Sequence, residues 1–106
     1  MANVTVEFDN YYIHYYSSNT YNLQAAINCG KGTTGGAAMI YFHKEGVSIP
    51  TNTLSGNMPV LNFPASLFGE IMAILLHEKP LKISLDSATG FGEIKTGSEP
   101  IGEEEP

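Results

Sequence analysis

Between residues 63 and 80, apolar side chains recur at the spacing of a helix and not at that of a strand. They fill an arc of roughly 200° on a helical wheel, wider than the ~100° stripe of a one-sided surface helix. The residues of this arc are Leu67, Phe68, Ile71, Met72, Ile74, Leu75 and Leu76. Pro64 suits the first turn, Asn62 is predicted to cap it, and Pro80 prevents its continuation. We therefore predict one amphipathic helix over about residues 64–78.

The rest of the chain has the pattern of short strands separated by turns. Alternating or continuous apolar runs predict strands near residues 4–16 (with a turn or bulge at Asp9-Asn10), 21–29, 37–43, 58–63, 81–85 and 91–96. The order is β-β-β-(β)-α-β-β, which indicates an α+β fold. We expect an antiparallel sheet of about five or six strands, with the helix packed on one face. Residues 1–96 form the predicted domain, and residues 97–106, with four glutamates, a mobile acidic tail.

The wide apolar arc of the helix has two interpretations. Either the helix is sunk deeply into its own sheet, or part of the arc is covered by a second copy of the protein. Gly69 and Ala73 lie four residues apart, where another backbone has room to approach, and a helical glycine costs about 1 kcal/mol relative to alanine. We expect a homodimer, since small soluble proteins form them often. The predicted self-association residues are Phe68, Gly69, Met72, Ala73 and Leu76.

Composition narrows the possible partners. The chain has 106 residues and a formal net charge of −6, with five lysines scattered along it and no arginine. A phosphate-binding surface needs clustered basic side chains, so nucleic acid is disfavoured as a partner. A single cysteine, Cys29, forms no internal disulfide, and no stretch has the pattern of a signal peptide or a membrane span. We expect a cytoplasmic protein with no membrane association.

The best candidate for a binding face is a set of tyrosines and histidines. Tyr12, His14 and Tyr16 share one parity of a predicted strand, and Tyr41 and His43 share one parity of another. Such rings stack on bases or sugars, or form the centre of a protein interface. The alternative is that they pack as ordinary cross-strand pairs or under the helix.

Glycines at 30, 32 and 35 spell the G-x-G-x-x-G pattern of dinucleotide-binding folds. That interpretation needs a helix over residues 37–44, and no acidic residue follows where a ribose would be held. We favour a glycine-rich connection between two antiparallel strands.

Catalytic chemistry has little support in the sequence. Cys29 with His14 or His43 could in principle form a nucleophile pair. No acid or amide side chain lies at a sequence position that indicates it would orient the histidine. The histidines show no metal-ligand spacing, so we expect no metal and no cofactor. The sequence therefore favours a small non-enzymatic protein-interaction module, self-associating as a homodimer, whose other protein partner it does not identify. The alternative is binding of single-stranded nucleic acid or a small ligand through the Tyr/His face.

Overall fold

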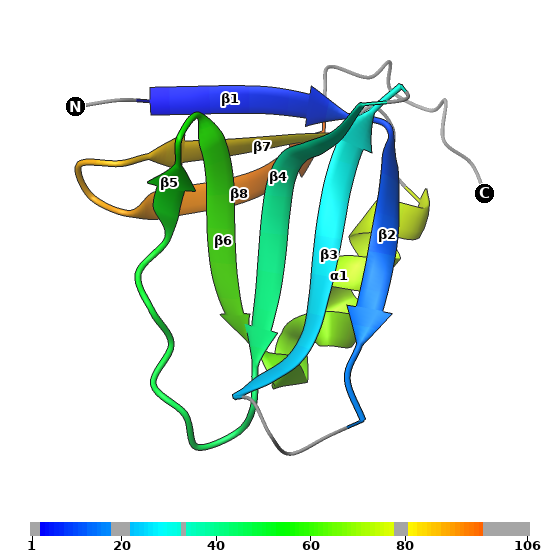
Figure 1. The fold of residues 1–106 in the computed structure, drawn as a ribbon, viewed down its shortest axis with the longest axis vertical. Coiled ribbons are helices and arrows are strands. Elements are labelled where there is room, and N and C mark those ends of the chain that lie inside the picture. The colour runs from blue at the N-terminus through cyan, green and yellow to red at the C-terminus, as the bar shows by residue number, and fades with distance from the viewer. Residues whose placement is uncertain (1–2, 18–21, 33, 78–80, 97–106) are drawn as a thin grey trace.

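The computed structural model describes residues 3–17, 22–32, 34–77 and 81–96. They form eight strands: β1 (Asn3–Phe8), β2 (Asn10–Tyr15), β3 (Leu23–Lys31), β4 (Thr34–His43), β5 (Thr53–Ser55), β6 (Met58–Pro64), β7 (Leu81–Asp86) and β8 (Phe91–Thr96). One helix, α1 (Phe68–His77), follows a short 3-10 turn, η1 (Ala65–Leu67). The strands make a five-stranded sheet of order β2-β3-β4-β6-β5 and a three-stranded sheet of order β1-β7-β8 (Figure 1). The predicted α+β class with one helix is confirmed, and the predicted tail, residues 97–106, lies outside the described residues.

The prediction of one antiparallel sheet is wrong because the first long strand bends at Asp9 and enters both sheets. Side chains hold this corner against the β3–β4 hairpin. The Asp9 carboxylate accepts a hydrogen bond from the backbone N–H of Gly32 at 3.0 Å, and Asn10 Nδ2 donates to the Gly32 carbonyl at 2.8 Å. The bend lets β1 pair with β7 while β2 pairs with β3.

A second departure is that β6 runs parallel to β4. After β4 the chain passes through residues 44–52 to the far edge of the sheet, where it forms β5. It then turns at Gly56, whose φ of +66° suits glycine, and returns between β5 and β4. A hairpin that starts from the outer edge brings its second strand in parallel to β4.

The G-x-G-x-x-G stretch is the tip of the β3–β4 hairpin. Residues 34–43 are a strand and not the helix that a dinucleotide site requires. Gly32 sits at a φ of +60°, where a side chain would be strained. The dinucleotide interpretation is therefore wrong, and the connection between two antiparallel strands is confirmed.

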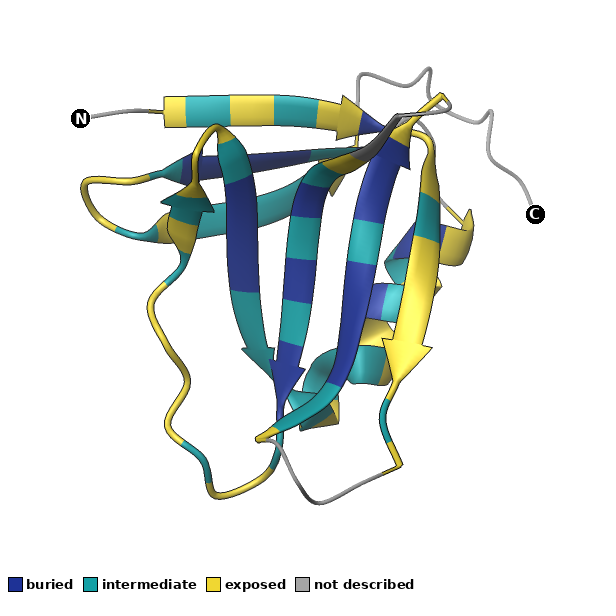
Figure 2. Ribbon diagram, viewed as in Figure 1, coloured by how far each residue is buried: buried dark blue, intermediate teal, exposed yellow. Residues whose placement is uncertain are grey.

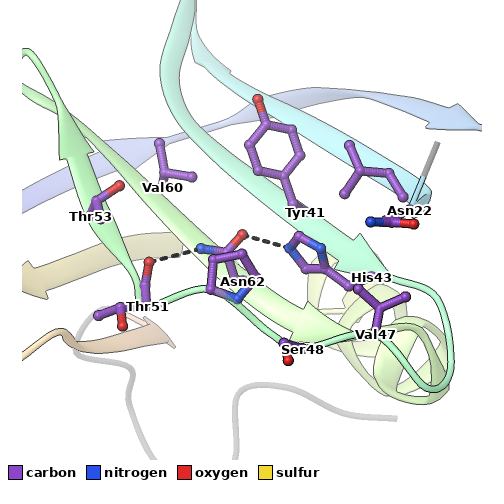
Figure 3. Close-up of a pocket in the computed structure, with 11 residues that line it drawn as sticks. Asn22, Tyr41, His43, Val47, Ser48, Thr51, Thr53, Val60 and Asn62 are labelled. Atoms are coloured by element: carbon purple, nitrogen blue, oxygen red, sulfur yellow. Dashed lines mark hydrogen bonds between the residues drawn. The ribbon is translucent and has the colours of Figure 1, made fainter.

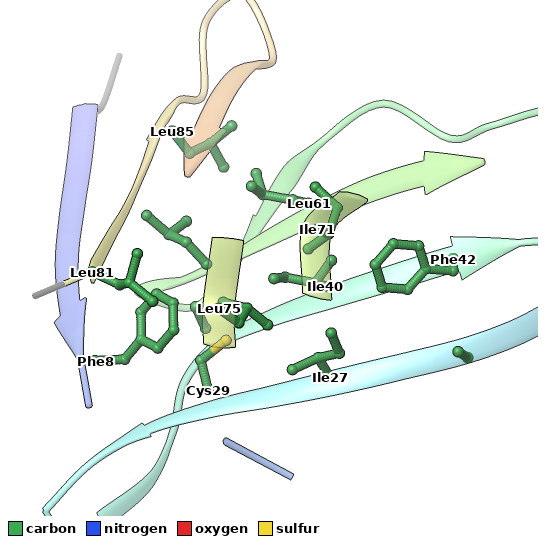
Figure 4. Packing of buried hydrophobic residues seen from close by; sticks show 13 residues of the cluster. Phe8, Ile27, Cys29, Ile40, Phe42, Leu61, Ile71, Leu75, Leu81 and Leu85 are labelled. Atoms are coloured by element: carbon green, nitrogen blue, oxygen red, sulfur yellow. The ribbon is translucent and has the colours of Figure 1, made fainter. Parts of the chain in front are cut away.

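The core lies on one face of the five-stranded sheet. Both α1 and the three-stranded sheet cover this face, and the opposite face points away from them (Figure 1). Residues from all three layers meet there (Figure 4): Phe8, Ile27, Cys29, Ile40, Phe42, Leu61, Ile71, Leu75, Leu81, Ile83 and Leu85. Each large side chain fully buried in such a core contributes about 1.5–3 kcal/mol.

The helix begins four residues later than predicted. Pro64 is still the last residue of β6, paired with His43 and extended at ψ 151°, so helical geometry cannot start there. Within α1 only Ile71 and Leu75 are buried, and Leu76 is 60 % exposed. The apolar arc is therefore wider than the layer that covers it.

The two glycines Gly92 and Gly69 make a matched pair for testing this packing. A Cβ at Gly92 would overlap the buried Leu61 Cδ2 and lie 3.1 Å from Asn52 Nδ2, whereas one at Gly69 meets nothing within 4 Å. We expect Gly92→Ala to lower the free energy of unfolding by about 1–3 kcal/mol. Gly69→Ala should raise it by up to about 1 kcal/mol. Urea denaturation measures both, and equal effects would contradict this account of the core.

Candidate functional site

A continuous apolar surface begins on the helix side of β2. Ile13 and Tyr15 point to this side, because they pair with residues of β3 that belong to the core, yet they are 44 % and 63 % exposed. The Tyr15 ring meets the Phe68 ring edge-on, with centroids 5.3 Å apart. Phe68 in turn meets the buried Phe42 ring at 5.0 Å, so the surface is anchored in the core.

The same surface continues along α1. Met72 and Leu76 follow Phe68 at intervals of four residues and so lie on one ridge of the helix. We call Ile13, Tyr15, Phe68, Met72 and Leu76 the apolar strip. It contains no charged side chain. In Figure 2 the strip's β2 portion belongs to the most exposed strand of the large sheet.

The strip lies beside an unprotected sheet edge. Proteins protect exposed edges with charges, prolines, bulges or very short strands. Of the four edge strands in the described part of the chain, β1 carries Glu7, β8 carries Glu93 and Lys95, and β5 has three residues. β2 has six residues, none of them charged and none proline. It is the edge best suited to pairing with another strand.

The opposite face of the five-stranded sheet carries a hollow of about 460 Å³ (Figure 3). It opens between β4, β6 and the loop over residues 44–52, and none of its lining side chains is lysine, aspartate or glutamate. Tyr41, Val47, Thr53 and Val60 form part of its wall. Its size and mostly apolar wall are typical of small-molecule pockets.

Hydrogen bonds hold the loop over this hollow. His43 Nε2 lies 2.8 Å from Asn62 Oδ1, and because an amide oxygen only accepts, His43 donates. Asn62 Nδ2 donates to the Thr51 carbonyl at 3.2 Å, and the Asn62 backbone N–H donates to Asn52 Oδ1 at 2.6 Å. Asn52 Nδ2 completes the chain by donating to the Gly90 carbonyl at 3.1 Å. The buried imidazole of His43 thus holds the Asn62 amide, and Asn62 bonds to the loop at Thr51 and Asn52.

The predicted Tyr/His residues are only partly brought together. Tyr41 and His43 both line the hollow. Tyr12 and His14 point to the same face as Tyr41, but β3 separates them from it and both are exposed. Tyr16 lies just beyond the end of β2 and is half-buried. Two of the five predicted residues therefore line the hollow.

The predicted self-association residues lie on one exposed side of α1. Phe68 and Met72 are half-buried, while Gly69, Ala73 and Leu76 are exposed. No atom lies within 4 Å of a Cβ built at Gly69, so one isolated copy gives no packing reason for this glycine.

Ile13, Tyr15 and Asn62 were not predicted as residues of the two surfaces, and neither were the wall residues Val47, Thr53 and Val60. Ile13 and Tyr15 belong to the strip, although Tyr12 and His14 were selected from the same strand. The uncharged, proline-free sequence of residues 10–15 was the signal that could have found them. Asn62 was predicted to cap the helix, but its amide holds the loop instead and no side-chain cap is present at η1.

Cys29 is not part of either surface. It is fully buried on the helix side of the sheet, whereas His14 and His43 point to the opposite face. Burial raises the pKa of the Cys29 thiol from 9.0 to about 12, so it is protonated at neutral pH. The described geometry therefore does not form the Cys/His nucleophile pair. No group of three or more potential metal-ligating side chains occurs among the described residues either.

The raised pKa of Cys29 predicts how stability depends on pH. Below pH 9 the thiol is protonated in both the folded and unfolded states, so it contributes no pH dependence. Between pH 9 and about 12 only the unfolded state ionises, so stability falls as pH rises. Cys29→Ala should show a shallower fall than the parent in urea titrations over this range. Iodoacetamide should label unfolded protein quickly and folded protein slowly, and rapid labelling of the folded state at neutral pH would contradict this.

Comparisons with known proteins give no family. No family model, curated protein or solved structure matches the chain. Across residues 3–17, 22–32, 34–77 and 81–96, the structure contains no helix with the length and apolarity to span a membrane. The function of the two surfaces is therefore inferred from their own residues.

Proposed function

We propose that this protein is a small non-enzymatic interaction module that self-associates as a homodimer through the apolar strip. The observation that carries the proposal is the exposure of Tyr15 and Leu76 on one surface continuous with the core through Phe68. Contiguous exposed apolar surface on a small protein marks an interaction site. Its aromatic and methionine side chains are those enriched in interfaces.

Charge favours the strip as the place where two copies meet. Two chains that each carry a net charge of −6 repel each other. The strip is uncharged, so two copies can meet there without opposing like charges. This selects the strip over the charged edges of β1 and β8.

Leu76→Ser tests the proposal against a matched control, Phe91→Ser. Leu76 is 60 % exposed within the strip, and Phe91 is 66 % exposed at the start of β8, outside it. We expect Leu76→Ser to raise the dimer dissociation constant by about tenfold or more, because both copies lose a leucine whose burial contributes about 1.5–3 kcal/mol. Phe91→Ser should leave it unchanged. Sedimentation velocity over a concentration series measures both.

Two outcomes would overturn the proposal. One is a parent protein that sediments as a monomer throughout the series. The other is equal weakening by both serine variants, which would indicate non-specific association of exposed apolar groups.

A second candidate function is binding of a small ligand in the hollow, favoured by the apolar wall that Tyr41 forms beside the His43–Asn62 pair. The absence of charged side chains from this wall favours an uncharged ligand over nucleic acid. Titration with a labelled single-stranded oligonucleotide at low and high salt tests the nucleic-acid form. Binding at low salt that Tyr41→Ala abolishes would support nucleic-acid binding at the hollow, and no binding would remove the nucleic-acid form alone.

A further inference from the structure

We infer that the second copy joins as a strand: β2 pairs antiparallel with β2 of the other chain, about a twofold axis at Ile13. This rests on the proposed self-association and specifies its geometry. The five-stranded sheets of the two copies then form one continuous sheet across the seam. The inference depends on which backbone groups of β2 are free.

The hydrogen bond between Tyr16 and Gln24 identifies the free groups. The Tyr16 backbone N–H donates to the Gln24 carbonyl at 2.9 Å, and this pair continues the register of β2 with β3. In an antiparallel ladder, hydrogen-bonded and non-hydrogen-bonded pairs alternate. The even-numbered residues of β2 therefore bond to β3. Tyr11, Ile13 and Tyr15 direct their N–H and C=O groups to the open edge.

Only one symmetric register pairs these three residues entirely with one another. With the axis at Ile13, this residue faces its own counterpart, and Tyr11 faces Tyr15 of the second copy in both directions. Each of these three pairs is a hydrogen-bonded pair that exchanges two bonds. An axis at Tyr11 or Tyr15 leaves part of the ladder without partners. An axis at an even-numbered residue still places odd-numbered residues opposite each other, but at least one of Tyr11, Ile13 and Tyr15 then faces a residue outside β2.

The same register brings the two apolar strips together. A twofold axis perpendicular to the sheet places both α1 helices on the same side of the joined sheet. In Figure 1 the C-terminal part of α1 extends behind and beyond β2. It therefore reaches over the seam, carrying Leu76 toward the second copy. Formation of the β2–β2 pair then covers both the exposed ridge of α1 and the exposed edge of β2.

The absence of charge makes this pairing permissible. Cross-strand neighbours of like charge destabilise a sheet, and in a symmetric pair a charge on the axis faces its own copy. The β2 sequence is N-Y-Y-I-H-Y, with no lysine or acid. On the other face Tyr12 lies opposite His14 of the second copy, so the exposed Tyr/His pair also gains a partner.

Disulfide trapping with Ile13→Cys tests the register, with Tyr15→Cys as the matched control on the same edge. Hydrogen-bonded antiparallel partners have Cα atoms about 5.5 Å apart, within the range that a disulfide spans. Two copies of residue 15 would be four positions out of register, roughly 13 Å apart. Under a glutathione redox buffer we expect most Ile13→Cys protein, and little Tyr15→Cys protein, to run as a crosslinked dimer without reductant. Parent protein should not crosslink, because Cys29 is buried.

The outcomes separate the register from the proposed function. A parent dimer in solution with no Ile13→Cys crosslink would overturn the β2 pairing and leave self-association standing. A monomeric parent would overturn both. Equal crosslinking of Ile13→Cys and Tyr15→Cys would indicate random encounters and also overturn the register. If Ile13→Cys fails to fold, an equimolar mixture of Tyr12→Cys and His14→Cys proteins applies the same test, since these residues face each other in this register.

Discussion

Phe42→Ala lowers the free energy of unfolding by about 3–5 kcal/mol, the usual cost of removing a buried phenylalanine ring. Phe42 is fully buried, stacks on Phe63 with centroids 6.0 Å apart, and meets Phe68 edge-on at 5.0 Å. Its removal leaves a cavity under the start of α1. Urea denaturation followed by far-ultraviolet circular dichroism measures the loss.

Phe42→Leu is the control for this prediction. It keeps most of the volume and should cost less than about half as much. Because Phe42 supports Phe68, and Phe68 supports Tyr15, the alanine variant should also weaken the dimer. A cost below about 1 kcal/mol for Phe42→Ala would mean that this aromatic cluster does not hold the helix on the sheet.

Ile13→Lys weakens the dimer by about 2 kcal/mol or more, roughly 30-fold in the dissociation constant. In the proposed register the two new ammonium groups face each other across the axis, and lysine on an edge strand opposes pairing. Thr53→Lys is the control, since it places the same charge on β5, the opposite edge of the same sheet. Sedimentation equilibrium at two salt concentrations measures both. A dimer unaffected by Ile13→Lys would exclude β2 from the interface.

Local pattern was enough to predict the helix and most strands. The spacing of apolar residues between Leu67 and Leu76 depends only on near neighbours, and α1 forms there. The helix start was missed because pairing of β6 with β4 holds Pro64 extended. That pairing joins residues about twenty positions apart, which no local pattern records.

The local sequence pattern also did not predict the division of the strands into two sheets. Asp9 and Asn10 were recognised as a turn or bulge, but their side chains decide the outcome by bonding to Gly32 in the β3–β4 hairpin. The parallel pairing of β6 likewise depends on the path of residues 44–52 across the sheet. Such long-range contacts determine which strands become neighbours.

The candidate surfaces were predicted only in part, for a related reason. Residues 11–16 are aromatic or apolar in both parities, so the sequence does not specify which set faces the helix. The structure turns Ile13 and Tyr15 to that side, and Tyr12 and His14 to the other. The wide apolar arc of the helix was a more informative signal, because Leu76 does remain exposed.

The most direct test is the solution mass of the unmodified protein, measured by light scattering at micromolar concentration. The account predicts twice the 11.5 kDa mass of one chain. A mass of one chain across the whole concentration range would contradict it, because the apolar strip and the open edge of β2 would then remain uncovered in water.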